Sequence, residues 1–482
     1  MIKRILFFLL AIILLLACLL LFNTFRFTSR QSVAELKPAP EIPADALIHF
    51  TEAVHYKTIS YVDTSLLDTA QFFGFHRFLK ITYPLVHQRL SLRVVEKYSL
   101  LYKWEGKNPK LNPVVLMAHQ DVVPIEAGTE KMWTVDPFSG TLKDSFIWGR
   151  GTADDKINLI SIMEAAEKLL KENYQPERDI YFSFGHDEEV GGKGAQAAAA
   201  FFKTENITPD LVLDEGGIIS LNKVPGMIKP VALIGTSEKG YLSLELSVEK
   251  NGGHSSMPEP ETSIDILTKA IVKLRDKPFD PNFSPSTQGF IKNLGPEMPF
   301  VQKMVFANIW LFKPIVIGIY EKSGAGNAMI RTTAVPTMIN SGIKDNVVPT
   351  IAKATINFRL LPGNSSTIVI KKVRAIINDE RVQITPYQSF ISEPSTVTSE
   401  ESYAYKKIDA AIKSTYGGKL VTSPFLMIGG TDSRYFGEVS KGIIKFSPMI
   451  DPIGFHGIDE RVSLESYKTA LWFFEQLMRN AD

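Results

Sequence analysis

Residues 113–121 read PVVLMAHQD, an apolar run that ends in three polar side chains. A short apolar run of this kind is typical of a strand buried inside a sheet. Residues 180–184 and 211–213 form two more such runs, and each leads into acidic residues. Between the first two runs, residues 157–172 carry apolar side chains at the spacing of one helix face. This strand–helix–strand order predicts an α/β sheet, in which ligands bind at the carboxyl ends of the strands.

A different pattern begins with residues 241–248 (YLSLELSV), which alternate between apolar and polar side chains. Such alternation is expected of a strand with one solvated face. A helix follows at 262–276, and further alternating strands are expected at 352–360 and 382–386. We therefore expect a smaller α+β domain inserted into the first domain, whose mixed pattern resumes near residue 400.

Within that insertion, residues 300–320 are apolar but interrupted by polar residues and a proline. The interruptions are Lys303, Asn308, Lys313 and Pro314, so the segment is not expected to form a second membrane span. We expect a buried helix pair here. An apolar wall near a substrate channel is the alternative.

The composition is that of an ordinary globular protein. Of 482 residues, 45% are hydrophobic and 22% are charged, so the chain can bury a large core. A formal net charge of +1 argues against nucleic acid as a partner. The single cysteine, Cys18, excludes an internal disulfide, a cysteine-based zinc site and a CxxC redox centre. A bound metal would therefore be held by imidazoles and carboxylates.

The N-terminus carries a candidate membrane segment. Residues 5–22 are 18 consecutive apolar residues, and a helix of this length spans about 27 Å, close to the ~30 Å hydrocarbon core of a bilayer. The nearest small-residue cleavage site, at 32–34, lies well beyond this run. A lipoprotein signal at Cys18 fits poorly because the apolar run continues past it. We expect a single-pass signal anchor with the globular part outside the cytoplasm; secretion after signal cleavage is the alternative.

Candidate metal ligands follow the predicted strands. His119 ends the first strand, and Asp121 points the same way, so its carboxylate can orient the imidazole. Further acids lie in residues 149–156 (GRGTADDK), where a helix-capping role is the alternative. Residues 185–192 (GHDEEVGG) hold three consecutive acids, which are costly to bury unless water or a cation neutralises them.

Two more polar sites complete this pattern. Asp214 and Glu215 end the third strand, and His456 lies in a glycine-flanked loop. Two histidines and three carboxylates can form two metal sites that share one bridging carboxylate, with three protein ligands at each. Two such zinc ions can activate a hydroxide, and Glu188 and Glu189 can divide the roles of general base and ligand.

Several of these strings resemble those of the M20 metallopeptidases, most closely the branch of carboxypeptidase S and the N-acyl-amino-acid hydrolases. They are LMAHQDVVP (116–124), W…DPFSG (133–140), WGRG…DDK (148–156) and DEEVGG (187–192). The resemblance covers about residues 45–480. It implies a zinc-peptidase-like mixed α/β sheet flanked by helices, with an inserted α+β lid and dimerisation domain and an N-terminal transmembrane helix.

The resemblance also implies a ligand set. Asp154 would bridge two zinc ions, for which Co²⁺ or Mn²⁺ are alternatives. The other ligands would be His119 and Asp214 on one ion, and Glu189 and His456 on the other.

Further roles follow from the same resemblance. Asp121 would orient the first histidine, and Glu188 would act as the general base. Some relatives use the acid at the position of Glu215 in place of Asp214, so this ligand stays open. The Asp154–Asp155 peptide is expected to be cis.

The inserted domain matches the family's lid at NGGHSSMP (251–258). There His254 would stabilise the oxyanion of the tetrahedral intermediate, often from a partner subunit, so a homodimer is expected. Asn346 and Arg359 match substrate-contacting positions, and Arg434 lies in a further pocket loop. Either arginine could hold a substrate carboxylate through paired hydrogen bonds.

These observations divide the chain into five parts. They are a transmembrane anchor (1–25), a linker (26–44), the first part of the catalytic domain (45–236), the lid and dimerisation domain (237–392) and the second part of the catalytic domain (393–482). We predict a membrane-anchored di-zinc hydrolase that cleaves the amide bond to an amino acid with a free carboxylate. Its substrates would be peptides or N-acyl amino acids. A metal-dependent phosphoesterase and an inactive anchored binding protein are the alternatives.

Overall fold

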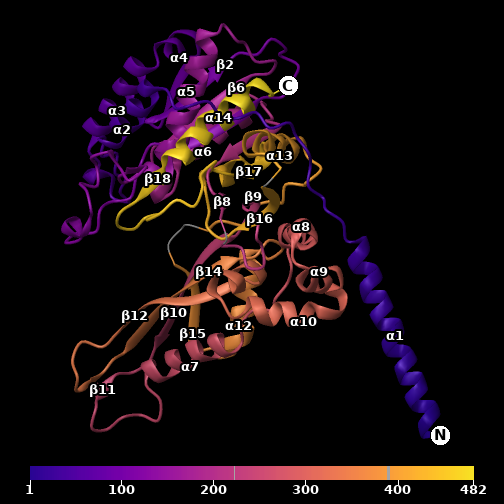
Figure 1. Cartoon of the computed structure of the whole chain (residues 1–482). Helices are drawn as coiled ribbons and strands as arrows, with labels where there is room; N and C mark the ends of the chain where they lie inside the picture. Colours follow the sequence, from indigo (N-terminus) through magenta and orange to yellow (C-terminus); the bar gives the residue numbers. More distant parts are fainter. Residues whose placement is uncertain (222, 388–390, 419, 482) are drawn as a thin grey trace.

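The computed structural model describes residues 1–221, 223–387, 391–418 and 420–481. Within these ranges the chain forms a large domain with a nine-stranded mixed sheet and a small domain with a four-stranded antiparallel sheet. An apolar helix at the N-terminus projects from the body (Figure 1). The expected fold class is therefore confirmed.

The central strands of the large sheet are parallel to one another, and the sheet changes direction between β2 and β6 on one side and between β17 and β9 on the other. In spatial order its strands are β1 (Ser91–Val95), β2 (Ser99–Trp104), β6 (Ile180–Gly185), β3 (Val114–His119), β7 (Leu211–Asp214), β17 (Ile443–Lys445), β9 (Val231–Glu238) and β16 (Val421–Met427), with β8 (Ile219–Ser220) paired to β9. Because β6, β3 and β7 are mutually parallel, their carboxyl ends lie together at one edge of the sheet.

Helices cover both faces of this sheet because its central strands are apolar on both sides. Val114 and Leu116 of β3 pack into a core with one group of helices, and Val115 and Met117 pack into a core with another. The first group is α2 (Ala44–Val54), α3 (Thr69–Thr82), α4 (Pro84–Arg89), α5 (Ile157–Lys171), α13 (Tyr403–Tyr416) and α14 (Leu464–Arg479); α6 (Lys193–Thr204) covers the other face.

The small domain packs two helices on one antiparallel sheet. The strand order is β12 (Thr333–Ser341), β14 (Ile351–Leu360), β10 (Gly240–Glu249) and β15 (Val382–Pro386), and the helices are α7 (Ser263–Asp276) and α12 (Ser366–Ile377). Thr262 and Asp265 form a capping box that starts α7. A separate ribbon of β11 (Gly253–His254) and β13 (Val347–Val348) lies at the end of this domain farthest from the large sheet (Figure 1).

Three short strands flank the large domain beside the loop that carries His456. They are β18 (Arg461–Ser463), β5 (Phe146–Trp148) and β4 (Thr141–Lys143), which form one antiparallel sheet.

The expected helix pair at residues 300–320 is present, but the expectation that it is buried is wrong. These residues form α9 (Phe300–Ala307) and α10 (Ile309–Tyr320), which meet at an angle of 114°. All residues of α9 are partly or fully exposed, and in α10 Val316 is buried while the rest are partly or fully exposed. The pair packs with α8 (Pro285–Leu294) and α11 (Gly324–Ile330) against β9 and β16 of the large domain. Apolar composition alone does not reveal what covers a helix.

The N-terminal helix α1 (Ile2–Arg26) is apolar and long enough to cross a membrane. Its only described contact region with the body lies at its C-terminal end, where it packs on α9. An extended segment, 27–43, then leads to α2.

Candidate metal centre

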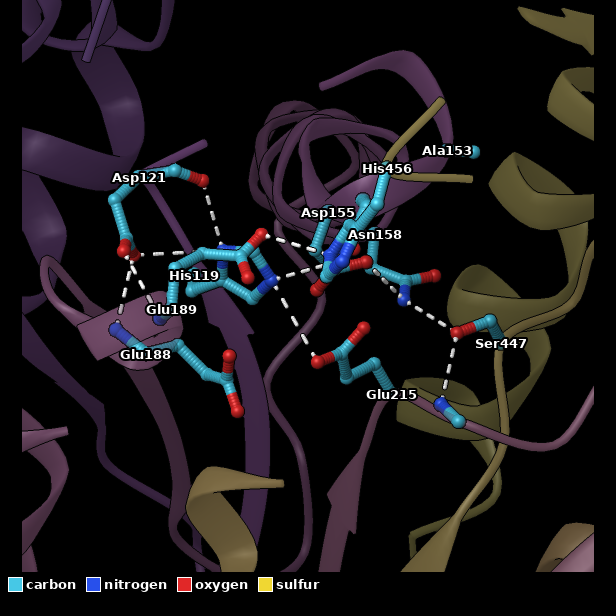
Figure 2. A network of polar contacts seen from close by, with 12 residues as sticks. His119, Asp121, Ala153, Asp155, Asn158, Glu188, Glu189, Glu215, Ser447 and His456 are labelled. Carbon is cyan, nitrogen blue, oxygen red and sulfur yellow. Dashed lines mark hydrogen bonds and ion pairs between the residues drawn. The ribbon is translucent and has the colours of Figure 1, made fainter. Parts of the chain in front are cut away.

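His119, the last residue of β3, is the centre of a buried polar cluster (Figure 2). Its Nδ1 lies 2.9 Å from the backbone carbonyl oxygen of Asp121, and because a carbonyl only accepts, Nδ1 donates there. Its Nε2 lies 2.9 Å from Asp154 Oδ1 and 3.6 Å from Glu215 Oε1. Burial lowers the pKa of His119, but the hydrogen bonds to the three acids outweigh it and raise the pKa well above its usual value. A proton or a metal ion must therefore join Nε2 to these carboxylates.

Asp121 connects this histidine to the loop that carries the next two acids. Its side chain accepts hydrogen bonds from Ser60 Oγ at 2.6 Å and from the backbone N–H groups of Glu188 at 3.1 Å and Glu189 at 3.2 Å. Burial opposes ionisation, but contact with His119 and these hydrogen bonds lower the pKa of Asp121 overall. Asp121 is thus an ionised, buried carboxylate that holds both the imidazole and the loop in place.

Asp154 lies between the two predicted histidine ligands. Its Oδ1 faces His119 Nε2 at 2.9 Å, and its Oδ2 faces His456 Nε2 at 2.7 Å. His456 also lies 3.2 Å from Glu189 Oε1. Hydrogen bonds to Asp154 and Glu189 raise the pKa of His456 to about 10. The Asp154–Asp155 peptide bond is cis, as expected.

The loop that carries His456 depends on a glycine. Gly454 has φ +77°, a conformation that favours glycine, and a Cβ there would lie 2.7 Å from backbone atoms of Ile458 and Glu460. His456 itself has φ +54°. The loop therefore folds tightly back on itself to bring the imidazole over Asp154.

Sequence reasoning missed a buried ion pair that connects the two halves of the cluster. Glu460 Oε1 accepts hydrogen bonds from the backbone N–H groups of Ala153 at 2.8 Å and Asp154 at 3.2 Å. Glu460 Oε2 accepts from Arg150 Nη1 at 2.6 Å, and Arg150 also donates to the carbonyl oxygen of His456. Glu460 lies four residues after His456, but an acid at that spacing carries no recognisable signal in a single sequence.

The neighbouring acids Asp214 and Glu215 point to different partners. Asp214 Oδ1 accepts from the Glu215 backbone N–H at 3.0 Å, and Oδ2 accepts from the Ser433 N–H at 2.6 Å. Glu215 instead reaches His119 and forms with it and Asp155 one group of potential metal ligands. A second group contains His119, Asp154 and Glu189. Of the two acids that the sequence left open, the structure places Glu215 in the cluster.

Asp155 extends the cluster toward the core. Its Oδ1 accepts from Asn158 Nδ2 at 2.6 Å, and Asn158 also donates to Ser447 Oγ at 2.9 Å (Figure 2). Its Oδ2 is buried and accepts no hydrogen bond from any residue that the structure describes. Burial and the charge of Glu215 raise the pKa of Asp155 well above its usual value. The position of Asp155 inside the cluster of potential ligands was not predicted from the sequence.

Glu188 lies beside the ligand groups with its carboxylate on the side of His119 and Glu215 (Figure 2). Burial, then the charges of Asp432 and Glu189, raise its pKa well above the usual value, while the nearby Arg434 lowers it. A carboxylate with a raised pKa can accept a proton near neutral pH and release it again.

The lid residues lie apart from this cluster. His254 is exposed on β11, and its Nδ1 lies 2.8 Å from Ser256 Oγ. Asn346 is also exposed, and its backbone oxygen accepts from the Ser255 N–H, so the two predicted residues are neighbours. The ribbon that carries them is at the far end of the small domain (Figure 1). The chain by itself does not bring His254 to the cluster.

The two predicted arginines belong to different parts of the chain, Arg359 to β14 and Arg434 to the segment after β16. The Arg359 guanidinium stacks 4.9 Å from the Tyr241 ring, and Arg434 stacks 4.8 Å from the Tyr435 ring. Burial, with a contribution from the charge of Arg434, lowers the pKa of Arg359. The charge of Arg434 therefore acts on Arg359.

Known proteins match this chain over most of its length. The model for "Peptidase family M20/M25/M40" matches residues 115–480. The chain is 39% identical to a probable carboxypeptidase S-like 2 of Dictyostelium discoideum, over 96% of this chain and 92% of that protein. It is 36% identical to the human N-fatty-acyl-amino acid synthase/hydrolase PM20D1, over 89% of this chain and 86% of that protein.

Solved structures share the fold. An M20 family metallo-carboxypeptidase from Sulfolobus solfataricus, Sso-CP2, superposes with a TM-score of 0.67 at 18% identity, covering 91% of this chain and 99% of that one. Human carnosine dipeptidase 1 superposes with a TM-score of 0.60 at 14% identity, covering 90% and 95%.

Proposed function

The chain belongs to peptidase family M20/M25/M40, as the sequence motifs indicated, and from this premise we propose that it is a two-metal hydrolase of amides formed by amino acids with a free carboxylate. The observation that carries the proposal is the position of Asp154, with one carboxylate oxygen on His119 and the other on His456. A carboxylate held between two imidazoles in this way has the geometry of a bridging ligand.

The residues of the cluster fit a pair of divalent cations. Burial, and then the charges of neighbouring acids, raise the pKa values of three carboxylates in this region, those of Glu188, Asp155 and Glu215. Such crowding of acids is costly unless cations compensate it. Asp155 Oδ2, buried and without a hydrogen-bond donor among the described residues, also fits a site that a cation completes.

We assign the ligands from these contacts. Asp154 is the bridge, His119 and Glu215 complete one site, and Glu189 and His456 complete the other. Glu215 replaces Asp214 in this assignment because its Oε1 lies 3.6 Å from His119 Nε2 and it groups with His119 and Asp155. Nitrogen and oxygen ligands in this number suit Zn²⁺, with Co²⁺ or Mn²⁺ as alternatives.

The reaction then divides among the residues of the chain. Two bound cations would polarise the amide carbonyl and lower the pKa of a water molecule. Glu188 takes the proton from the attacking water and delivers it to the leaving amine. Asp121 keeps Glu188 in place through its backbone N–H and keeps His119 in its metal-binding tautomer.

Substrate recognition falls to the two arginines and to the lid. We assign the free carboxylate of the substrate to Arg434 or Arg359, since a guanidinium donates two parallel hydrogen bonds to such a group. Asn346 and His254 would complete the site, with His254 donating to the oxyanion. Because both lie on the exposed tip of the small domain, they reach a metal cluster only by domain closure or from a second subunit.

A homodimer through the small domain supplies that second subunit. The edge strand β12 is exposed along most of its length and leaves its outer hydrogen-bonding edge open among the described strands. Val335, Met338 and Ile339 on it expose large apolar side chains. An exposed apolar edge strand is a natural surface for pairing with a second copy.

An apolar acyl group suits this molecule better than a polar peptide. A cavity of about 650 Å³ lies between β9, β16 and the helices α8 to α11. It reaches Phe425 and Ile428, just before the loop that carries Arg434, and its other walls are largely apolar. The homologous N-fatty-acyl-amino acid hydrolases act on such amides by name. We therefore favour N-acyl amino acids over dipeptides.

We place the protein in a membrane through α1 as a single-pass anchor, with its enzymatic part outside the cytoplasm. The helix has an 18-residue apolar run, and the chain continues past it without a small-residue cleavage site close by.

A substrate panel tests the function. The full chain in detergent, stripped of metal and reloaded with Zn²⁺, is given N-acyl amino acids of increasing chain length, dipeptides and a phosphate ester. We expect metal-dependent amide hydrolysis that increases with acyl length. Hydrolysis of the phosphate ester without amide hydrolysis would contradict the proposal.

A further inference from the structure

The outer face of the bent helix pair α9 and α10, here called the α9–α10 hairpin, exposes large apolar side chains to the outside of the molecule. Four of them lie away from the apolar cavity and expose between 39% and 58% of their surface: Phe300, Trp310, Leu311 and Ile315. Single exposed apolar residues are ordinary, but a contiguous group of this size marks an interaction surface.

The inner face of the hairpin is already occupied. Val305 and Phe306 of α9, and Val316 and Tyr320 of α10, line the apolar cavity or the core beside it. Because these side chains face the body, the outer group cannot turn inward without emptying that core. The outer face therefore needs a partner from outside the domain.

The contacts of α1 identify that partner. Asn308, the fully buried residue at the bend of the hairpin, accepts a hydrogen bond from Asn23 Nδ2 at 2.8 Å and donates to the Leu20 carbonyl oxygen at 3.1 Å. The rings of Phe25 and Phe300 lie 6.3 Å apart. All three contacts involve the last turns of α1, where the apolar run of residues 5–22 ends.

We infer that the α9–α10 hairpin lies in the bilayer surface beside α1, with its outer apolar face among the lipid acyl chains. This inference rests on the proposed role of α1 as a membrane anchor. The hydrogen bonds of Asn308 hold the hairpin beside the end of α1, at the depth where α1 leaves the hydrocarbon core. The exposed face of the hairpin therefore adjoins the lipid around α1.

The dimensions of the hairpin fit an interfacial position rather than a second span. Helix α10 has 12 residues and α9 has 8, with a bend of 114° between them, so each is about 12–18 Å long, far short of the ~30 Å hydrocarbon core. Lys303 can extend its ammonium group to the headgroups from such a position. Trp310 suits the interface, where tryptophan is enriched.

The consequence is a body held close to the membrane by two elements. The extended segment 27–43 is itself held to the large domain, because Gln31 contacts Thr422 and Lys413 and the Lys37 carbonyl oxygen accepts from Trp472. With the hairpin embedded, the helices that line the apolar cavity also touch lipid, so the cavity lies directly beside the bilayer surface.

Tryptophan quenching by brominated lipid tests the inference on the full chain. Trp310 is exposed, whereas Trp104, Trp133 and Trp148 are buried in the large domain. The emission of Trp310 is obtained by subtracting the tryptophan fluorescence of W310F from that of the native chain. Both are measured in phosphatidylcholine vesicles with and without bromine on the acyl chains. We expect bromine to reduce that difference by about half or more.

The state of α1 is read separately through Cys18, the single cysteine of the chain. In the same vesicles, protection of Cys18 from a charged, membrane-impermeant maleimide shows that α1 is inserted. Labelled Cys18 would overturn the anchor and the hairpin inference together. Protected Cys18 with unquenched Trp310 would overturn the hairpin inference alone, and a solvent-shielded but unquenched Trp310 would assign the face to a protein partner instead of lipid.

Paired charges provide a second measurement. L311D/I315D places two carboxylates on the outer face, away from the cavity, and should abolish most of the bromine quenching of Trp310. The matched control V62D/I81D adds the same charge to two exposed apolar positions of the large domain and should leave quenching unchanged. Hydrolysis of a short, water-soluble amide should stay unchanged in both variants, which shows that they fold. Equal quenching in both variants would overturn the inference.

Discussion

The metal-ligand cluster and the tip of the small domain are the two regions that carry the predicted chemistry, and the chain builds them very differently. In the cluster, His119, Asp154 and Glu215 are buried; His119 donates to the Asp121 carbonyl oxygen, and the Asp154 backbone donates to Glu460. At the tip, His254 and Asn346 are exposed on a two-stranded ribbon and contact mainly their own loop.

This difference indicates a division of labour. A buried cluster whose side chains are fixed before substrate arrives can bind metal and position a base without rearrangement. A donor on an exposed tip can act only after another movement or another subunit brings it close. The two regions should therefore respond differently to mutation, to mixing of chains and to pH.

The largest effect is expected within the cluster. E188Q removes the proposed base while keeping the size of the side chain, so turnover should fall about 10²–10⁴-fold. The metal content, measured by elemental analysis, should stay at the native level because Glu188 is not assigned as a ligand. Loss of metal along with activity would make Glu188 a ligand rather than the base.

The tip should give the next largest effect. H254A removes a donor to the oxyanion and should lower turnover about 10²–10³-fold, whereas H55A, at a surface histidine that contacts Ser139, should leave turnover near the native value.

Mixing the two inactive chains then shows which subunit supplies His254. If the partner subunit does, a dimer of one E188Q chain and one H254A chain contains one complete site. An equal mixture should therefore regain about a quarter of native activity. A mixture that stays inactive would mean that closure within one chain delivers the histidine.

A smaller effect is expected at Glu460, which supports the cluster without being assigned as a metal ligand. E460Q weakens the ion pair with Arg150 that connects the His456 loop to the Asp154 backbone. Metal affinity should fall about 10–100-fold. E475Q removes another buried, ion-paired glutamate far from the cluster and should leave metal affinity unchanged. Equal metal affinities of E460Q and E475Q would show that Glu460 does not support the metal site.

The junction between the two regions should show the smallest effect, in stability. Lys239 joins β9 to β10, and its Nζ donates to the carbonyl oxygens of Ala328 and Arg331. Burial lowers the pKa of Lys239 from its usual value to about 7. Between pH 7 and 10 the unfolded chain therefore binds the proton that the folded chain has released, so this group makes stability rise with pH.

Chemical unfolding at several pH values tests this slope. K239M should flatten the rise in unfolding free energy between pH 7 and 9.5, by up to about 1.4 kcal/mol per pH unit. Identical slopes in the native chain and the variant would show that Lys239 stays protonated in the fold.

Much of the architecture was predictable because local patterns reflect burial directly. The strand expected at 113–119 is β3, and the helix expected at 262–276 is α7. The helix shows the spacing of one apolar face, whereas the strand is a short apolar run bounded by Pro113 and by polar residues. The helix pair at 300–320 was expected but its exposure was not, because an apolar run does not show which of its faces another element covers.

The candidate site was predictable to the extent that strand ends collect ligands. His119, Asp154, Glu189 and His456 do come together in the structure. The choice between Asp214 and Glu215 was not predictable, because adjacent residues at a strand end point in opposite directions and only the backbone geometry selects one. Glu460 was missed because its role depends on contacts with residues about 300 positions away.

Anomalous diffraction from crystals of the Zn²⁺-loaded protein tests the central claim most directly. The account predicts two zinc peaks about 3.5–4 Å apart, one on each side of the Asp154 carboxylate, with Glu215 at one and Glu189 and His456 at the other. A single peak, or two peaks that do not share Asp154, would contradict it.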